Sequence, residues 1–138
     1  MHHIQKATLE IDAKAQLGEG ALWHPGENKL YWVNIEGRML HIYDPVTREN
    51  NSLPVNERVG TVVPVEHGGA LVALQNGIHF INAQTGALRF IANPITDGNI
   101  RFNDGKCDPS GRFWVGTMHL SFTEGVASLY RMDTDKTV

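Results

Sequence analysis

The sequence predicts an all-β protein, and more specifically a β-propeller built from four-stranded blades. Nearly every apolar segment alternates with polar residues or forms a short run between turn-forming residues, and none keeps a helical spacing over about ten residues. Similar patterns of strands and turns recur about every 40 residues, which is the length of one four-stranded blade. We therefore expect residues 1–138 to form a single, partial propeller domain of about three blades.

The expected strands alternate in polarity and are separated by turns rich in Gly, Pro, Asn and Asp. They cover residues 20–24, 29–35, 39–44, 61–66, 69–75, 77–82, 87–92, 111–118 and 127–133. A further alternating strand begins at residue 100 and is interrupted by the polar stretch Asn103-Asp104-Gly105. This interruption is either a simple turn or a functional site.

The repeat is clearest between residues 24–47 and residues 108–135. Each segment contains a turn, a strand with an aromatic pair, a second strand and a closing Asp, and residues 68–86 resemble a compact version of it. The aromatic pairs are expected to pack in the sheet core. A β-sandwich with regular hairpins is the alternative, but it has no reason to repeat these features in the same order.

The composition gives no indication of a nucleic-acid or membrane partner. The formal charge of −3 is spread along the chain, and 20% of the residues are charged. The longest apolar run, Ala70–Leu74, is too short to span a membrane, and the first residues lack the apolar stretch of a signal peptide. The single cysteine, Cys107, cannot form an internal disulfide. We therefore expect a cytoplasmic protein.

Polar residues just before a blade's first turn are the best candidates for a site, because propellers bind ligands at a mouth of their central channel. Glu19 lies between two glycines in "LGEG", and Arg101, Asn103 and Asp104 occur in "RFND". Carboxylate and amide oxygens suit Ca²⁺, Mg²⁺ or Mn²⁺. The competing interpretation is that these Gly, Asn and Asp residues only form turns.

Two motifs make the sequence recognisable. "LGEGALWHPGENKLYWVNIEGRMLHIYDP" and "RFNDGKCDPSGRFWVGTM" closely resemble the SMP-30/gluconolactonase/regucalcin-like family of six-bladed propellers. The resemblance implies that Glu19 is a metal ligand and that Arg101 and Asn103 face a sugar lactone, which is hydrolysed with a bound divalent cation. Calcium is the expected cation, followed by magnesium or manganese, with zinc as a further option. The polar stretch at Asn103 would then be both a turn and a site.

About three of the six blades expected from this resemblance fit within 138 residues. The remaining metal ligands and the general base are therefore expected beyond Val138. A complementing second half or a homodimer could complete the propeller. The alternative function is a non-catalytic binding or assembly module with a weak cation site. The stretch after "GTM" carries His119, Ser121 and Glu124 where some relatives place a substrate-contacting acid, so the particular lactone is left open.

Overall fold

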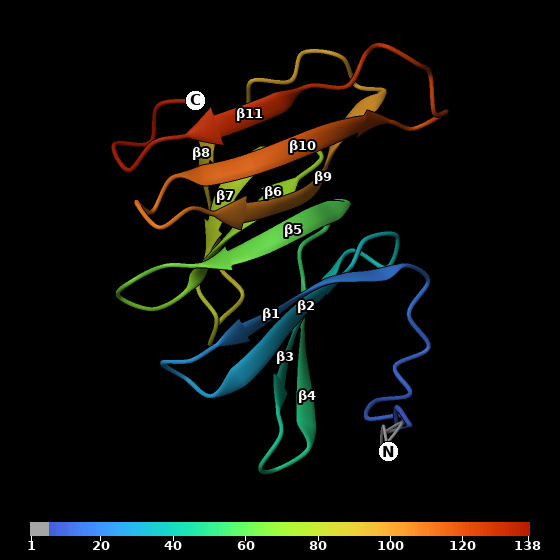
Figure 1. The fold of residues 1–138 in the computed structure, drawn as a ribbon, viewed down its shortest axis with the longest axis vertical. Coiled ribbons are helices and arrows are strands. Elements are labelled where there is room, and N and C mark those ends of the chain that lie inside the picture. Colours follow the sequence, from blue (N-terminus) through green and yellow to red (C-terminus); the bar gives the residue numbers. More distant parts are fainter. Residues whose placement is uncertain (1–5) are drawn as a thin grey trace, which may run out of the picture.

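The computed structural model describes residues 6–138 as three antiparallel sheets that lie one beside the next (Figure 1). Blade 1 consists of β1 (Gly18–His24), β2 (Lys29–Asn34), β3 (Met39–Asp44) and β4 (Glu49–Pro54). Blade 2 consists of β5 (Val59–Pro64), β6 (Ala70–Leu74), β7 (Gly77–Ile81) and β8 (Leu88–Ala92). Blade 3 consists of β9 (Ile100–Cys107), β10 (Phe113–His119) and β11 (Leu129–Met132). In each blade, strands consecutive in sequence are neighbours in the sheet, which confirms the predicted propeller blades.

The described part of the chain starts at Lys6, so the first residues used in the signal-peptide argument lie partly outside it. Between residues 6 and 138 the structure has no helix that could cross a lipid bilayer.

The first strand of each blade lies at the inner side of the assembly, where blades meet. Strand β5 packs against β9 on one side and against β1 and β2 on the other. The hydroxyl of Thr61 on β5 donates a hydrogen bond to the Gly105 carbonyl on β9 at 3.1 Å. The three innermost strands are therefore held close together, and their equivalent ends lie on the same side of the blades, which we call the mouth.

Two apolar clusters fill the spaces between blades. The cluster between blades 1 and 2 includes Tyr31 and Val33, and the cluster between blades 2 and 3 includes Phe102 and Phe113. Because side chains alternate across a strand, the aromatic pairs are split between two faces. Tyr31 and Phe113 are buried in the core, as predicted, whereas Trp32 and Trp114 are only half-buried.

The structure corrects the sequence analysis at the polar stretch of β9. Strand β9 continues through Asn103, Asp104 and Gly105 to Cys107, so this stretch is not a turn. The turn follows it, where the Gly111 amide donates to the Asp108 carbonyl at 2.9 Å.

Asp108 organises this turn through its carboxylate. The carboxylate accepts hydrogen bonds from Trp114 Nε1 at 2.9 Å, from Arg112 Nε at 2.6 Å and from the Ser110 amide at 2.9 Å. The Trp114 hydrogen bond, together with those from Arg112 and Ser110, lowers the pKa of Asp108 to about 2. The charged form of Asp108 is therefore favoured by folding.

We expect Asp108→Asn to flatten the dependence of stability on pH in acid. The pKa of Asp108 is depressed from its ordinary value of 3.8 in the folded protein. Its contribution to the free energy of unfolding is therefore present above pH 3.8 and is lost as the pH falls toward about 2. Urea unfolding at several pH values across this window measures the effect. The matched control is Asp12→Asn, because Asp12 is exposed and pairs only with exposed Lys14 in the described structure. If the stability of Asp108→Asn depended on pH in acid as that of the wild type does, the depressed pKa of Asp108 would be contradicted.

Candidate functional site at the channel mouth

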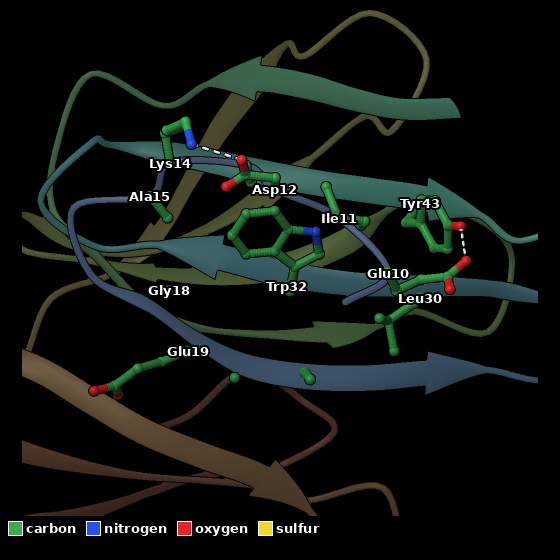
Figure 2. A pocket seen from close by; sticks show the side chains of 13 residues that line it. Glu10, Ile11, Asp12, Lys14, Ala15, Gly18, Glu19, Leu30, Trp32 and Tyr43 are labelled. Carbon is green, nitrogen blue, oxygen red and sulfur yellow. Dashed lines mark hydrogen bonds and ion pairs between the residues drawn. The ribbon is translucent and has the colours of Figure 1, made fainter. Parts of the chain in front are cut away.

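Glu19 lies near the start of β1, where the strand contains a β-bulge. Gly20 and Ala21 together oppose Trp32 of β2, which shifts the register between the two strands. Gly20 has a φ of 67°, a conformation that glycine adopts without steric cost. In Figure 2 the exposed Glu19 side chain points away from Trp32 and toward the brown strand, β9. The bulge thus directs Glu19 toward the innermost strands.

Arg101 and Asn103 contact each other on β9. Arg101 is only 5% exposed. Its Nη1 donates to the Asn103 Oδ1 at 3.2 Å and to the Phe102 carbonyl at 2.9 Å. Asn103 and Asp104 together oppose Gly116 of β10, so β9 is bulged at this point as well. The Asn103 oxygen accepts from Arg101, and the Nδ2 group of the same amide is a donor that a ligand could accept from.

The Glu19 carboxylate of β1 acts electrostatically on the Arg101 guanidinium of β9. Burial lowers the pKa of the Arg101 guanidinium, whereas the carboxylates of Glu36 and Glu19 act in the opposite direction. The cation of Arg58 lowers this pKa further. The structure therefore brings Glu19, Arg101 and Asn103 to this mouth, and adds Glu36 and Arg58 to them.

A chain of side-chain hydrogen bonds ties the three blades together at the same mouth. Arg58, which precedes β5, places its Nε 3.0 Å from both carboxylate oxygens of Glu36, which follows β2. Arg58 Nη1 donates to Gln75 Oε1 at 3.0 Å, and Gln75 Nε2 donates to the Gly98 carbonyl at 3.1 Å. The sequence does not single out these residues. Glu36 directly follows one expected strand and Gln75 ends another, but no pattern in the sequence marks Arg58.

Gly60 of β5 lies directly against the backbone that carries Arg101 and Asn103. A Cβ atom at Gly60 would lie 2.4 Å from the Phe102 carbonyl oxygen and 2.8 Å from that of Asn103. Both distances are far shorter than a van der Waals contact. Strand β5 also has a register shift between Val59 and Thr61, around this glycine. Gly60 is therefore what allows β5 and β9 to touch at the mouth.

The donor set fits a divalent cation only in part. Among residues 6–138 no group of three or more His, Cys, Asp or Glu side chains is arranged to hold a metal ion. Glu19 offers a hard carboxylate ligand, but Ca²⁺ takes roughly six to eight oxygen ligands. The Asn103 oxygen already accepts from Arg101, whose positive charge would oppose a cation beside it. Glu19 as a metal ligand stays a prediction.

The fold and the mouth together define the class of protein: part of a β-propeller whose innermost strands present a carboxylate, a guanidinium and an amide at one end. More specifically, the chain belongs to the SMP-30/gluconolactonase/LRE-like family, whose model matches residues 17–138. This confirms the resemblance seen in the two sequence motifs.

Relatives of known name and structure agree with this assignment. The chain is 40% identical over 131 residues to pentonolactonase XacC of Haloferax volcanii, covering 95% of this chain and 44% of that protein. It is 38% identical over 121 residues to 6-deoxy-6-sulfogluconolactonase of Pseudomonas putida, covering 86% and 41% of the two chains. The crystal structure of regucalcin from Agrobacterium tumefaciens, a calcium-binding protein, superposes with a TM-score of 0.84 at 27% identity, covering 90% and 42%. The chain thus spans less than half the length of these relatives.

Proposed function

We propose that this chain supplies part of the active site of a divalent-metal-dependent sugar lactonase. The observation that supports this function best is the contact between buried Arg101 and Asn103 at the mouth, within reach of the Glu19 charge. Family membership and the names of the lactonase relatives support the substrate class.

The residues of this chain would bind and orient the lactone. Arg101 and the Nδ2 group of Asn103 are hydrogen-bond donors suited to the hydroxyl groups and the carbonyl oxygen of a sugar lactone. Glu19 would provide one ligand to a divalent cation, with calcium preferred. When bound, such a cation polarises the lactone carbonyl and lowers the pKa of a coordinated water. We assign no general base among residues 6–138.

A non-catalytic binding module with a weak cation site is the second candidate function. The observation that favours it is that Glu36 is held by Arg58, which leaves Glu19 as the carboxylate that we propose as a ligand at the mouth. A single carboxylate gives low affinity for Ca²⁺, because the affinity of oxygen sites depends on the number of charged ligands.

Lactone hydrolysis by the 138-residue chain, with and without a chelator, distinguishes the two functions. Hydrolysis of gluconolactone above the spontaneous background that is lost on chelation supports the lactonase. Calorimetric binding of Ca²⁺ without hydrolysis supports the binding module. If the chain alone showed no hydrolysis and bound none of Ca²⁺, Mg²⁺ and Mn²⁺ at about millimolar concentrations, both functions would be contradicted for it.

Substitutions at Glu19 and Asn103 should have separable effects in a preparation that hydrolyses lactones. Glu19→Gln removes a charged ligand and should weaken cation binding by about tenfold or more. Asn103→Ala removes a neutral donor and should lower kcat/KM by about tenfold to a hundredfold, with little change in cation binding. The matched controls are Glu49→Gln and Asn51→Ala, at two exposed positions of β4. Parental rates and affinities in both site variants would show that the assignment is wrong.

A further inference from the structure

Arg101 is a buried cation that keeps hydrogen-bond donors available at the mouth. Among residues 6–138 it forms no ion pair. Its hydrogen bonds to the Phe102 carbonyl and to Asn103 Oδ1 both come from Nη1. Within the described part of the chain, Nε and Nη2 have no acceptor, and neither atom is fully enclosed by protein. Nε and Nη2 are therefore the donors of Arg101 that a ligand at the mouth could use.

Glu36 is the carboxylate best placed to occupy these donors instead of a ligand. Burial lowers the pKa of Arg101, and of the charged groups around it Glu36 opposes this effect most strongly, ahead of Glu19. Glu36 lies in the turn after β2, where the Arg38 amide donates to the Ile35 carbonyl at 3.2 Å. Its side chain is long, flexible and 41% exposed, so packing does not lock it in place. If Glu36 were released, the unpaired guanidinium of Arg101 would attract it.

Arg58 holds the Glu36 carboxylate in another position. Its Nε lies 3.0 Å from both oxygens of Glu36. Arg58 is itself fixed by Gln75 at two points, because the Gln75 amide donates to the Arg58 carbonyl at 2.9 Å and Arg58 Nη1 donates to Gln75 Oε1 at 3.0 Å. Arg58 is thus the fixed member of the ion pair, and Glu36 is the member that can move.

We propose that Arg58 is a positioning residue that keeps the Glu36 carboxylate off Arg101, so that Nε and Nη2 of Arg101 stay available to the lactone. This role rests on the proposed function of the mouth. Without Arg58, Glu36 would pair with Arg101 through charge-assisted hydrogen bonds, which are stronger than those to a neutral acceptor. A lactone is neutral and would have to displace the carboxylate. Loss of Arg58 would therefore weaken lactone binding without any contact between Arg58 and the lactone.

A purely structural role is the competing explanation, because the pair of Arg58 and Glu36 also joins blades 1 and 2. The side chains of Arg58 and Glu36 are 28% and 41% exposed, and ion pairs with this exposure contribute little to stability. The two roles differ in their dependence on Glu36. If Arg58 acts by restraining Glu36, then removing the Glu36 charge as well should restore the mouth, whereas a lost tie between blades would not be restored.

NMR of the arginine side chains in the free 138-residue chain tests the positioning role without a ligand. In Arg58→Met, exchange of the Arg101 Nε hydrogen with water should slow by about tenfold, because a charge-assisted hydrogen bond to Glu36 protects it. Adding Glu36→Gln should return the rate to within about twofold of the wild type, since a neutral acceptor binds the guanidinium less strongly. The control Arg48→Met removes another arginine that pairs with a glutamate, Glu10, and should leave the Arg101 rate unchanged.

Arg58→Lys provides a second, milder variant that carries the test if Arg58→Met does not fold. Lysine keeps the charge but lacks the planar fork that binds Glu36 and Gln75 together, so exchange at Arg101 should slow by about threefold. An Arg101 rate that stays at the wild-type value in both Arg58 variants would overturn the proposal. A slower rate that Glu36→Gln does not restore would overturn it as well.

Binding of gluconolactam relates the positioning role to the proposed function. This ring-nitrogen analogue of gluconolactone is neutral and resists hydrolysis, so an NMR titration can follow its binding to the chain. Arg58→Met should weaken binding by about fivefold to tenfold, and Glu36→Gln in the same chain should restore it. If the wild type bound no gluconolactam while exchange at Arg101 changed as expected, the proposed function would be contradicted and the positioning of Glu36 would stand. Weaker binding in Arg58→Met without slower exchange at Arg101 would overturn the positioning role.

Discussion

Replacing Phe102 by alanine should lower the free energy of unfolding by about 3–5 kcal/mol. Phe102 is 1% exposed and lies in the cluster between blades 2 and 3, with its ring edge-on to Tyr130 at a centroid distance of 6.3 Å. Removing the ring leaves a cavity between blades 2 and 3. Strands β5 and β9 cannot fill this cavity without losing their close packing against each other. Urea unfolding followed by far-UV circular dichroism measures the change.

Phe122→Ala is the matched control for this substitution. Phe122 is 80% exposed, so the same change in side chain should alter the free energy of unfolding by no more than about 0.5 kcal/mol. The Phe102 carbonyl accepts a hydrogen bond from Arg101, so loss of packing at Phe102 should also loosen the candidate site. Similar unfolding free energies for the two variants would contradict the proposed role of Phe102 in joining the blades.

The alternation of apolar residues was sufficient to predict most strands, but it failed at β4. Strand β4, Glu49–Pro54, contains a single buried side chain, Leu53. It exists because its backbone pairs with β3 from Met39 to Asp44, not because its own sequence has an apolar face. An outermost strand with little to bury leaves almost no periodic signal, so only the expected length of a four-stranded blade could have indicated it.

The sequence named three residues of the candidate site, and its local geometry was only partly predictable. Arg101 and Asn103 are in contact, but the stretch from Asn103 is a bulged strand instead of the expected turn. Gly, Asn and Asp residues are typical of turns and also tolerate bulges, so composition cannot separate the two. The contact between Glu36 and Arg58 was not predictable, because it depends on how two blades are placed relative to each other.

Gly60 is a further residue that the sequence did not single out, and Gly60→Ala should destabilise the protein by about 2–3 kcal/mol. The added methyl group would lie 2.4 Å from the Phe102 carbonyl oxygen and 2.6 Å from the carbonyl carbon. These are backbone atoms, so the contact cannot be relieved by a change of rotamer. Either β5 and β9 move apart or the core between blades 2 and 3 repacks, and both lose close packing.

The control for this change is Gly98→Ala, because a Cβ atom at Gly98 would meet no atom within 4 Å. Neither glycine has a positive φ, so the two substitutions differ in the space available and not in backbone strain. Gly98→Ala should unfold at about the wild-type urea concentration or slightly above it, since alanine restricts the unfolded chain. Because the clash at Gly60 involves the carbonyls of Phe102 and Asn103, Gly60→Ala should also disturb the contact between Arg101 and Asn103. Equal stability of the two variants would mean that β5 and β9 are not in contact at the mouth.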